Sequence, residues 1–401
     1  MQKSKNKPKK IYMAYASAAP MDVTVLKVVT EMMKKYFANP SSMHDLGVSA
    51  KKTLENARVK IASILAARPV EIIFTSGATE SNNMAIRGVL EAVKKKDFIP
   101  HIVTTNIEHA SVLEVCAFLE KQKLAEVTYV AVEKNGIVDA KKIKKAIQQN
   151  TVLVSIMYVN NEIGTIQPIQ EIAKEIRHYK KQQKEATKYP LFHTDATQAI
   201  NYLPITVEKL GVDLLSFNGS KIYGPKGVGA LYVKKNTPIH QILYGGDQEF
   251  SLRPGTENVV GVLGLATALE ITQKIKDKEI KRLNKLQEYF LSKLKSISGL
   301  IINGDTKNRI PNNLNITIPN IPSDLLVLEL NARGVYLSEK SACKTGEHKN
   351  SHVIEAIRLD KDISKSSLRF SLGRETKKED IDYVLKYLKV ILEKLSKWYK
   401  D

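Results

Sequence analysis

The chain has 401 residues, a length that allows two or three domains and is ample for a packed core. Hydrophobic residues make up 43% of the chain and charged residues 26%, which excludes a wholly disordered protein, a collagen and a coiled-coil rod. The 62 Lys and Arg against 42 Asp and Glu give a net charge of +20, which attracts polyanions, acidic protein surfaces and anionic cofactors but says nothing about fold.

The first residues and the cysteines bear on the compartment. Residues 1–10 are predicted to form a solvated basic tail, and no apolar stretch follows them as a secretory signal requires. The longest apolar run, Val152–Val159, is too short to span a bilayer. Two cysteines, Cys116 and Cys343, cannot form a disulfide framework or supply a Cys-rich metal site alone. We therefore expect a protein of the reducing cytoplasm, with no membrane partner.

Helices precede strands along the chain. Two amphipathic helices are expected at about 21–37 and 46–66. After them, short apolar runs rich in β-branched residues alternate with amphipathic stretches. The runs predicted as buried strands are Glu71–Phe74, His101–Thr105, Val127–Val132, Thr151–Val159, Pro190–Thr194 and Val212–Phe217. Strands separated by helices are typical of βαβ units, so the expected fold class is α/β with a mostly parallel sheet.

The pattern changes near residue 261. A long amphipathic helix is expected to about residue 297, and a closing helix over 376–398 begins with a possible capping box, Thr376 and Glu379. Between them lie a strand, Asn313–Ile318, and a helix near 322–333. We predict a basic tail over 1–10, a large domain over 11–260 whose first segment packs with the small domain, and a small α+β domain over 261–401.

Polar side chains follow the predicted strands at the edge where open parallel sheets bind ligands. The first strand leads into Thr75–Thr79, small residues that open a helix and suit a phosphate. The other strand ends are followed by Asn106, Glu108 and His109; by Asn160, Asn161 and Glu162; by Asp195 and Gln198; and by Asn218, Ser220 and Lys221, then the glycine-rich Gly224–Gly227.

Each of these features alone is commonplace, but together they match what pyridoxal phosphate needs. Lys221 offers an amine for a Schiff base. Asp195 keeps the pyridine nitrogen protonated, so that the ring works as an electron sink, and the ring can stack on His109. We therefore predict a pyridoxal 5'-phosphate site and no metal site.

Seven ordered segments carry a family resemblance: EIIFTSGATESNN, VSIMYVNNEIG, HTDATQ, SKIYGPKGVGALYV, LRPGTENV, KSACKTG and SLRFSLGR. From about Ile11 to Trp398, the chain resembles the cysteine desulfurases of the NifS/IscS type, in the class V aminotransferase family. The resemblance implies the fold type I architecture of pyridoxal-phosphate enzymes, with a seven-stranded-type sheet in the large domain, and a homodimer.

The resemblance also implies roles for single residues. Lys221 is the Schiff-base lysine and the base, and His109 stacks on the ring and shuttles protons. Asn161 and Arg369 bind the substrate carboxylate, since a planar guanidinium matches a carboxylate bidentately. The residues that it assigns to the cofactor are Lys221, Asp195, Gln198, His109, Ala78, Thr79, Ser220, Asn218 and, from the partner subunit, Thr256.

Cys343 is implied as the nucleophile. It lies in the polar stretch 341–352, which has no helix or strand pattern, and neighbouring lysines favour its thiolate. Cys116, in an apolar helical pattern, is expected to be a packing residue. The implied reaction removes sulfur from L-cysteine, releases L-alanine and leaves a persulfide on Cys343. An acceptor such as an iron–sulfur scaffold or a tRNA-thiolating enzyme then takes the sulfur, for iron–sulfur cluster assembly, tRNA thiolation or both.

Other functions remain open at this point. Another pyridoxal-phosphate enzyme of the same scaffold, a transaminase or a selenocysteine lyase, is one; the context of Cys343 argues against the first. A low-activity sulfur-relay scaffold is another. Direct nucleic-acid reading is not predicted, because the chain has no zinc-finger spacing, no RNP-like aromatic stretch and no DNA-reading motif.

The chain departs from the family pattern in a few places. Family members usually begin with a strand such as LDYSATTP or LDNAATTP, whereas this chain reads MAYASAAP. Ala14 replaces the acidic residue, and Ala18 and Ala19 replace the threonines. The histidine before the lysine is Ser220, whose hydroxyl can still donate to a phosphate. We expect these changes to affect the rate of the reaction rather than its kind.

Overall fold

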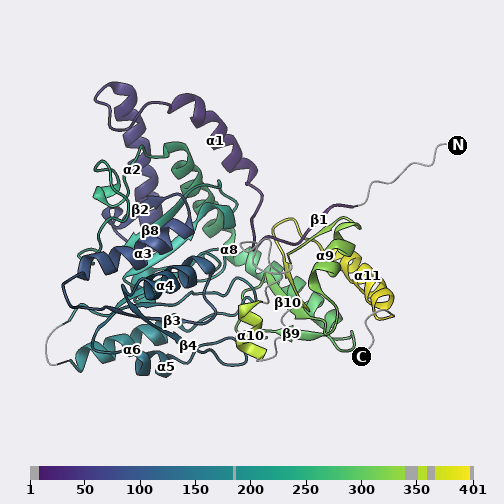
Figure 1. The fold of residues 1–401 in the computed structure, drawn as a ribbon. Helices are drawn as coiled ribbons and strands as arrows, with labels where there is room; N and C mark the ends of the chain where they lie inside the picture. Colours follow the sequence, from purple (N-terminus) through teal and green to yellow (C-terminus); the bar gives the residue numbers. More distant parts are fainter. Residues whose placement is uncertain (1–8, 184–186, 339–350, 359–365, 398–401) are drawn as a thin grey trace.

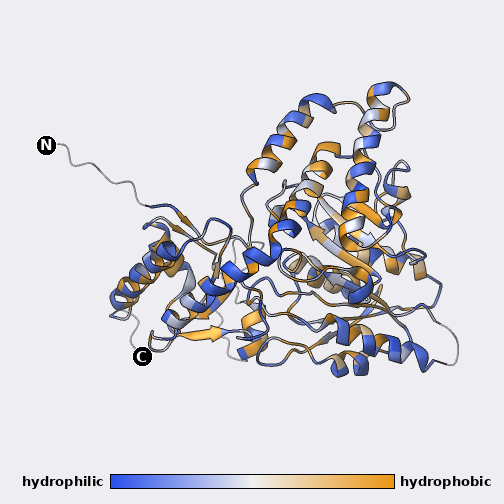
Figure 2. Ribbon diagram, turned by 180° about the vertical axis from the view of Figure 1, so that it is seen from behind, coloured by the Kyte–Doolittle hydropathy of each residue, from blue (hydrophilic) through white to orange (hydrophobic). Residues whose placement is uncertain are grey.

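The computed structural model describes residues 9–183, 187–338, 351–358 and 366–397. A large sheet covered by helices on both faces lies beside a smaller part built on a second sheet (Figure 1). In Figure 2 the apolar colour gathers on the strands and on the inward sides of the helices, while the outer helix faces are hydrophilic. No helix in these ranges is both long and apolar enough to cross a membrane.

The large sheet confirms the predicted fold class. Its strands run in the order β2-β8-β7-β6-β5-β3-β4. The strands are β2 (Ile72–Thr75), β3 (His101–Thr105), β4 (Glu126–Val130), β5 (Thr151–Ser155), β6 (Leu191–Asp195), β7 (Leu214–Asn218) and β8 (Gly229–Val233). β8 pairs antiparallel with β2 and β7, and the other neighbours are parallel. The pattern of apolar runs does not predict β8, because the glycine-rich segment that precedes it resembles a turn.

Seven helices of the described residues belong to this part of the chain, and the two whose bounds were predicted, α1 and α2, lie close to those bounds. The seven are α1 (Val23–Lys35), α2 (Asp45–Leu65), α3 (Ala78–Val93), α4 (Ala110–Lys121), α5 (Ala140–Ala146), α6 (Ile169–Lys181) and α7 (Val207–Leu210), with short 3-10 turns η1 (Pro69–Glu71), η2 (Gly219–Lys221) and η3 (Glu249–Ser251). α1 begins where a cap allows it, since Asp22 Oδ1 accepts from the Thr24 N–H at 2.8 Å. The packing prediction for Cys116 in α4 is confirmed: the side chain is fully buried, and burial raises the pKa of its thiol to about 12.

The smaller part follows α8 (Val259–Leu294), which packs against α1 and α2 and reaches the second sheet. That sheet is antiparallel, in the order β12-β10-β9. Its strands are β9 (Ile301–Asn303), β10 (Asn313–Thr317) and β12 (Ser367–Ser371), and its helices are α9 (Ser323–Asn331), α10 (His352–Arg358) and α11 (Lys378–Leu395). We propose that the boundary between a large and a small domain falls near residue 260, where α8 begins.

The N-terminal segment lies beside this smaller part. β1 (Ile11–Tyr12) pairs in parallel with β11 (Val335–Tyr336), and Ala14 forms a bridge with Ser371 of β12. The expected capping box of the closing helix is wrong in register. α11 begins at Lys378, and Asp380 accepts from the Lys377 N–H at 2.9 Å.

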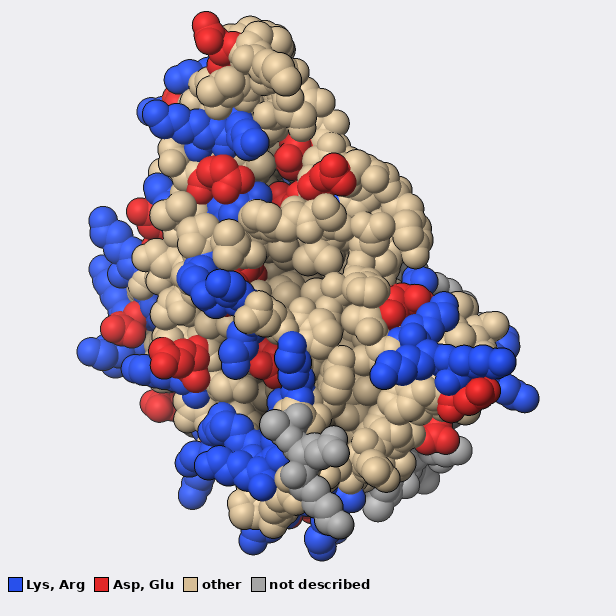
Figure 3. Space-filling model, turned by 90° about the vertical axis from the view of Figure 1, so that its left-hand side faces the viewer, with Lys and Arg blue, Asp and Glu red and all other residues tan. Residues whose placement is uncertain are grey.

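Positive charge gathers on the outer helices. Figure 3 shows Lys and Arg side chains clustered on the lower part of one face, with Asp and Glu dispersed among them. In Figure 1 this lower region holds α5 and α6, and α5 has the sequence AKKIKKA. The excess of lysine is thus in part a property of exposed helix faces away from the core.

Candidate active site

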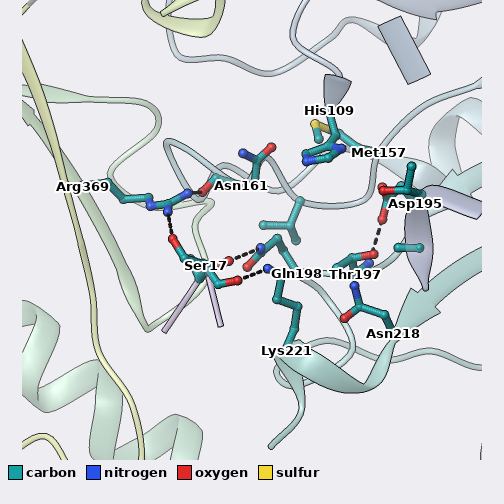
Figure 4. A pocket seen from close by; sticks show the side chains of 14 residues that line it. Ser17, His109, Met157, Asn161, Asp195, Thr197, Gln198, Asn218, Lys221 and Arg369 are labelled. Atoms are coloured by element: carbon teal, nitrogen blue, oxygen red, sulfur yellow. Dashed lines mark hydrogen bonds between the residues drawn. The ribbon is translucent and has the colours of Figure 1, made fainter. Parts of the chain in front are cut away.

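A cavity of about 160 Å³ lies between the carboxyl ends of the large-sheet strands and β12 of the second sheet. Figure 4 shows side chains from both sheets pointing into it. The residues that line it are Ala16, Ser17, Ala78, Thr79, His109, Met157, Val159, Asn161, Asp195, Thr197, Gln198, Asn218, Lys221 and Arg369. Of the residues predicted for the site, nine line this cavity: Ala78, Thr79, His109, Asn161, Asp195, Gln198, Asn218, Lys221 and Arg369.

Asp195 ends β6 and is held by two donors. Its Oδ2 accepts from Asn82 Nδ2 at 2.8 Å, and its Oδ1 accepts from the Thr197 N–H at 2.9 Å. Asn82 lies in α3, and its Nδ2 also donates to Ser111 Oγ. The carboxylate is 6% exposed. A carboxyl group oriented by these donors can stabilise a cation inside the cavity.

His109 caps α4 and is oriented by that role. Its Nδ1 accepts from the Ser111 N–H at 3.1 Å and lies 2.9 Å from Ser111 Oγ. Because Nδ1 accepts a hydrogen bond, we assign the proton of the neutral ring to Nε2. Figure 4 places the ring across the cavity from Lys221, near Asp195.

Glu108 lies next to the cavity without lining it. It is 1% exposed, and its carboxyl accepts from Thr105 Oγ1 at 2.7 Å and from the Met157 N–H at 3.0 Å. Burial, with a smaller effect of the Asp195 charge, raises the pKa of Glu108 to about 8. Glu108 is therefore a neutral support for the backbone of Met157, a residue that does line the cavity.

Lys221 closes the short turn η2 that follows β7. Its Nζ donates to the backbone carbonyl of Ser17 (Figure 4). Ser220 does not line the cavity, and its Oγ donates to Asn218 Oδ1 at 3.2 Å. The amine thus points into the cavity from the large sheet.

The N-terminus of α3 forms another wall of the cavity. Ala78 and Thr79 line it, and the first N–H groups of a helix have no partner within the helix. Gly229 lets this turn approach β8, since a Cβ at 229 would lie 2.8 Å from Gly77 Cα. A helix N-terminus that faces a cavity in this way suits a phosphate.

Arg369 enters from β12 and is 1% exposed. Its Nη1 donates to the Asn161 carbonyl at 2.8 Å, and its Nη2 donates to Ser17 Oγ at 2.6 Å. Arg369 and the Asn161 side chain lie together at the end of the cavity away from Asp195 (Figure 4). A guanidinium in this place can bind a carboxylate.

Of the predicted residues that the structure describes, Ser220 and Thr256 do not line this cavity. Thr256 is exposed, between η3 and α8, and does not line the cavity of its own chain. Cys343 lies outside the described residues. Sequence reasoning missed Ala16, Ser17, Met157, Val159 and Thr197. Of these, only Thr197 could have been found from the sequence, because it lies two residues after Asp195, which follows a predicted strand.

The donor set fits pyridoxal phosphate. The described part of the chain offers an amine, a hydrogen-bonded carboxylate, an imidazole and a helix N-terminus around one cavity. These are the groups that a Schiff base, a pyridine nitrogen, an aromatic ring and a phosphate require. Within the same described ranges, no group of three or more His, Cys, Asp and Glu is placed to hold a metal ion.

Comparisons with known proteins agree with this geometry. A family model described as Aminotransferase class-V matches residues 11–384. The chain is 45% identical over 388 residues to the cysteine desulfurase IscS of Dictyoglomus turgidum, covering 96% of this chain and 95% of that one. It is 43% identical over 390 residues to the cysteine desulfurase IscS of Methanosarcina thermophila, covering 96% and 93%. Among solved structures, a NifS-like protein matches with a TM-score of 0.88 and 35% identity, covering 96% of this chain and all of that one.

Proposed function

The chain belongs to the class V aminotransferase family, and from this premise we infer that it is a pyridoxal-phosphate-dependent cysteine desulfurase. It removes sulfur from L-cysteine and hands it to an acceptor. The observation that carries this inference is the cavity that holds Lys221, Asp195 and His109 at one end and Arg369 at the other.

We propose that nine residues hold the cofactor, seven of which line this cavity. They are Lys221, Asp195, Gln198, His109, Ala78, Thr79, Ser220, Asn218 and, from a partner subunit, Thr256. When bound, pyridoxal phosphate supplies an electron sink for negative charge that develops at the substrate Cα. Asp195, held by Asn82 and the Thr197 N–H, would stabilise positive charge at the ring nitrogen.

Side chains of the protein bind the substrate and transfer its protons in this proposal. Arg369 and Asn161 bind the substrate carboxylate, which orients the Cα–H bond toward Lys221. Lys221 Nζ takes the Cα proton, and His109 Nε2 is placed to donate or accept a proton on the opposite side of the cavity.

The sulfur step belongs to Cys343 in this proposal. Its thiolate forms a bond with the substrate sulfur, and the C–S bond of the substrate breaks. The electron pair of that bond stays with the β-carbon, which takes up one proton, and Lys221 returns the proton to Cα, so that the product leaves as L-alanine. The protein retains a persulfide, from which a sulfur-acceptor protein takes the terminal sulfur for iron–sulfur cluster assembly or tRNA thiolation.

A homodimer is part of the proposal. Exposed apolar side chains gather on α1 and on the segment that joins it to α2, including Val23 (81% exposed), Met33 (66%), Phe37 (75%) and Met43 (98%). A patch of this kind favours burial by a second copy. The exposed Thr256 supports the same arrangement, because it is free to reach another subunit's cavity. We also propose a cytoplasmic location, on the low cysteine content.

One experiment tests the function. The protein is loaded with pyridoxal phosphate and given L-cysteine and a thiol reductant, and alanine and sulfide are quantified together beside Cys343→Ala and Lys221→Ala. Equal amounts of both products from the wild type, lost in both variants, are expected. Absence of alanine from a wild type that binds the cofactor would instead favour another substrate, such as selenocysteine, or a sulfur-relay role.

A further inference from the structure

The turn that follows β1 links the two sides of the active site. Its Ala16 N–H donates to Ser371 Oγ of β12 at 2.9 Å, and its Ala19 N–H donates to the Ser220 carbonyl at 2.9 Å. The Tyr12 hydroxyl fastens the turn from outside by donating to the Ala18 carbonyl at 2.8 Å. The backbone between these anchors is therefore fixed relative to both sheets.

Ser17 is the residue of this turn that touches the reacting groups. Its Oγ accepts from Arg369 Nη2 at 2.6 Å and lies 2.9 Å from Ser338 Oγ. Its backbone carbonyl accepts from Lys221 Nζ. Figure 4 shows Ser17 between Arg369 and Lys221, with contacts to both.

We propose that the Ser17 hydroxyl is a positioning group that orients Arg369 for the α-carboxylate of the substrate, an inference that rests on the proposed function. An arginine side chain has many rotamers, and ordering it on ligand binding costs affinity. Two acceptors fix the plane of the Arg369 guanidinium before the substrate arrives, the Asn161 carbonyl at Nη1 and Ser17 Oγ at Nη2. The plane of the guanidinium decides whether a carboxylate can bind through two parallel hydrogen bonds.

The side chain of Ser17 is not needed to hold the turn. The Ser17 N–H donates to the Ala14 carbonyl at 2.8 Å, and the neighbouring backbone groups have the anchors given above. The contact to Lys221 uses the backbone carbonyl, which a substitution keeps. Ser17→Ala therefore removes a hydroxyl from Arg369 and from Ser338 and leaves the remaining contacts in place.

The segment MAYASAAP aligns with the family sequences LDYSATTP and LDNAATTP. Both strings have alanine where this chain has Ser17, and both have threonine where it has Ala18 and Ala19. Neither Ala18 nor Ala19 lines the cavity, whereas Ser17 does. The hydroxyl next to Arg369 is thus a feature of this chain and not of those strings.

The test compares two ligands of the holoenzyme that cannot be desulfurated. L-Alanine carries the carboxylate, and ethylamine is the same skeleton without it; both dissociation constants are read from the absorbance of the bound cofactor. For Ser17→Ala we expect the dissociation constant of L-alanine to rise about tenfold and that of ethylamine to stay unchanged, because the hydrogen bond lost from Arg369 concerns the carboxylate, which ethylamine lacks. Ser17→Thr, which keeps a hydroxyl, should restore L-alanine binding, and with L-cysteine the effect should fall on KM rather than kcat.

Tyr12→Phe is the matched control, because it deletes a hydroxyl that holds the same turn without touching Arg369. It should leave the ratio of the two dissociation constants as in the wild type. The inference is overturned if Ser17→Ala weakens both ligands equally, or if it leaves L-alanine binding unchanged or tighter. A wild type that forms no alanine and sulfide from L-cysteine, yet shows the selective loss in Ser17→Ala, would refute the desulfurase function and leave the carboxylate inference standing.

Discussion

Glu108 makes the stability of this protein depend on pH in a direction opposite to that of an ordinary carboxylate. Burial raises the pKa of Glu108 to about 8 in the folded chain, from 4.5 for a free glutamate. Between these values the folded protein keeps the proton and the unfolded chain loses it, so the unfolded state gains stability as the pH rises. The favourable contribution is complete below pH 4.5 and is lost as the pH passes through about 8.

The magnitude follows from the size of the shift. The difference between a pKa of about 8 in the folded chain and 4.5 in the unfolded chain corresponds to about 5 kcal/mol of unfolding free energy, of which about 4 kcal/mol falls between pH 5 and pH 9. Glu108→Gln keeps the shape and the acceptor for Thr105 Oγ1 and the Met157 N–H, but it cannot ionise. Between pH 5 and pH 9, the unfolding free energy of the variant should therefore rise by about 4 kcal/mol relative to that of the wild type.

The assay is urea unfolding of the cofactor-loaded protein at pH 5, 7 and 9. Glu133→Gln is the control, because Glu133 pairs with Lys142 on the surface and its side chain is half exposed. Its stability curve should run parallel to that of the wild type. Parallel curves for Glu108→Gln and the wild type would show that Glu108 is already ionised when folded, and would refute the reasoning.

Two further predictions concern other buried charges. Asn82→Ala removes a donor from Asp195 and should weaken cofactor retention about tenfold, measured as bound pyridoxal phosphate after dialysis; the surface variant Asn150→Ala should retain it fully. Arg58→Met removes the ion-pair partner of the buried Glu249 and should cost about 3–5 kcal/mol of unfolding free energy. Adding Glu249→Gln should recover part of that loss. A double variant that is no more stable than Arg58→Met would contradict this reasoning.

Local patterns predicted the strands and the residues that end them. A buried parallel strand is a short β-branched run, and its last residues must lie at the ligand-binding edge, so Asp195 and Lys221 could be placed from sequence. β8 and the start of α11 were harder, because glycine content and cap choice depend on packing partners. Gly229, for example, is required by its approach to Gly77, far away in the sequence.

Contacts between distant segments could not be predicted from residue patterns. Ser17 and Arg369 are 352 positions apart and meet because the segment after β1 lies against β12, where Ala14 forms a bridge with Ser371. Asn82 could not be chosen from the polar residues of α3 without knowing that this helix packs over β6. The resemblance supplied Thr256 and Cys343, which no strand-end argument reaches; their roles stay predictions.

The cavity lies at a junction, and the turn after β1 sets the distance across it. Arg369 comes from the second sheet, whereas Lys221 follows a strand of the large sheet. Ser371 holds the turn on the side of the second sheet, and Ser220 holds it on the side of the large sheet. The spacing between Arg369 and the Lys221 amine thus depends on this turn as well as on either sheet. A substitution in the turn can therefore change substrate binding without lining the cavity, and Ala18, in the place of a family threonine, is a substitution of this kind.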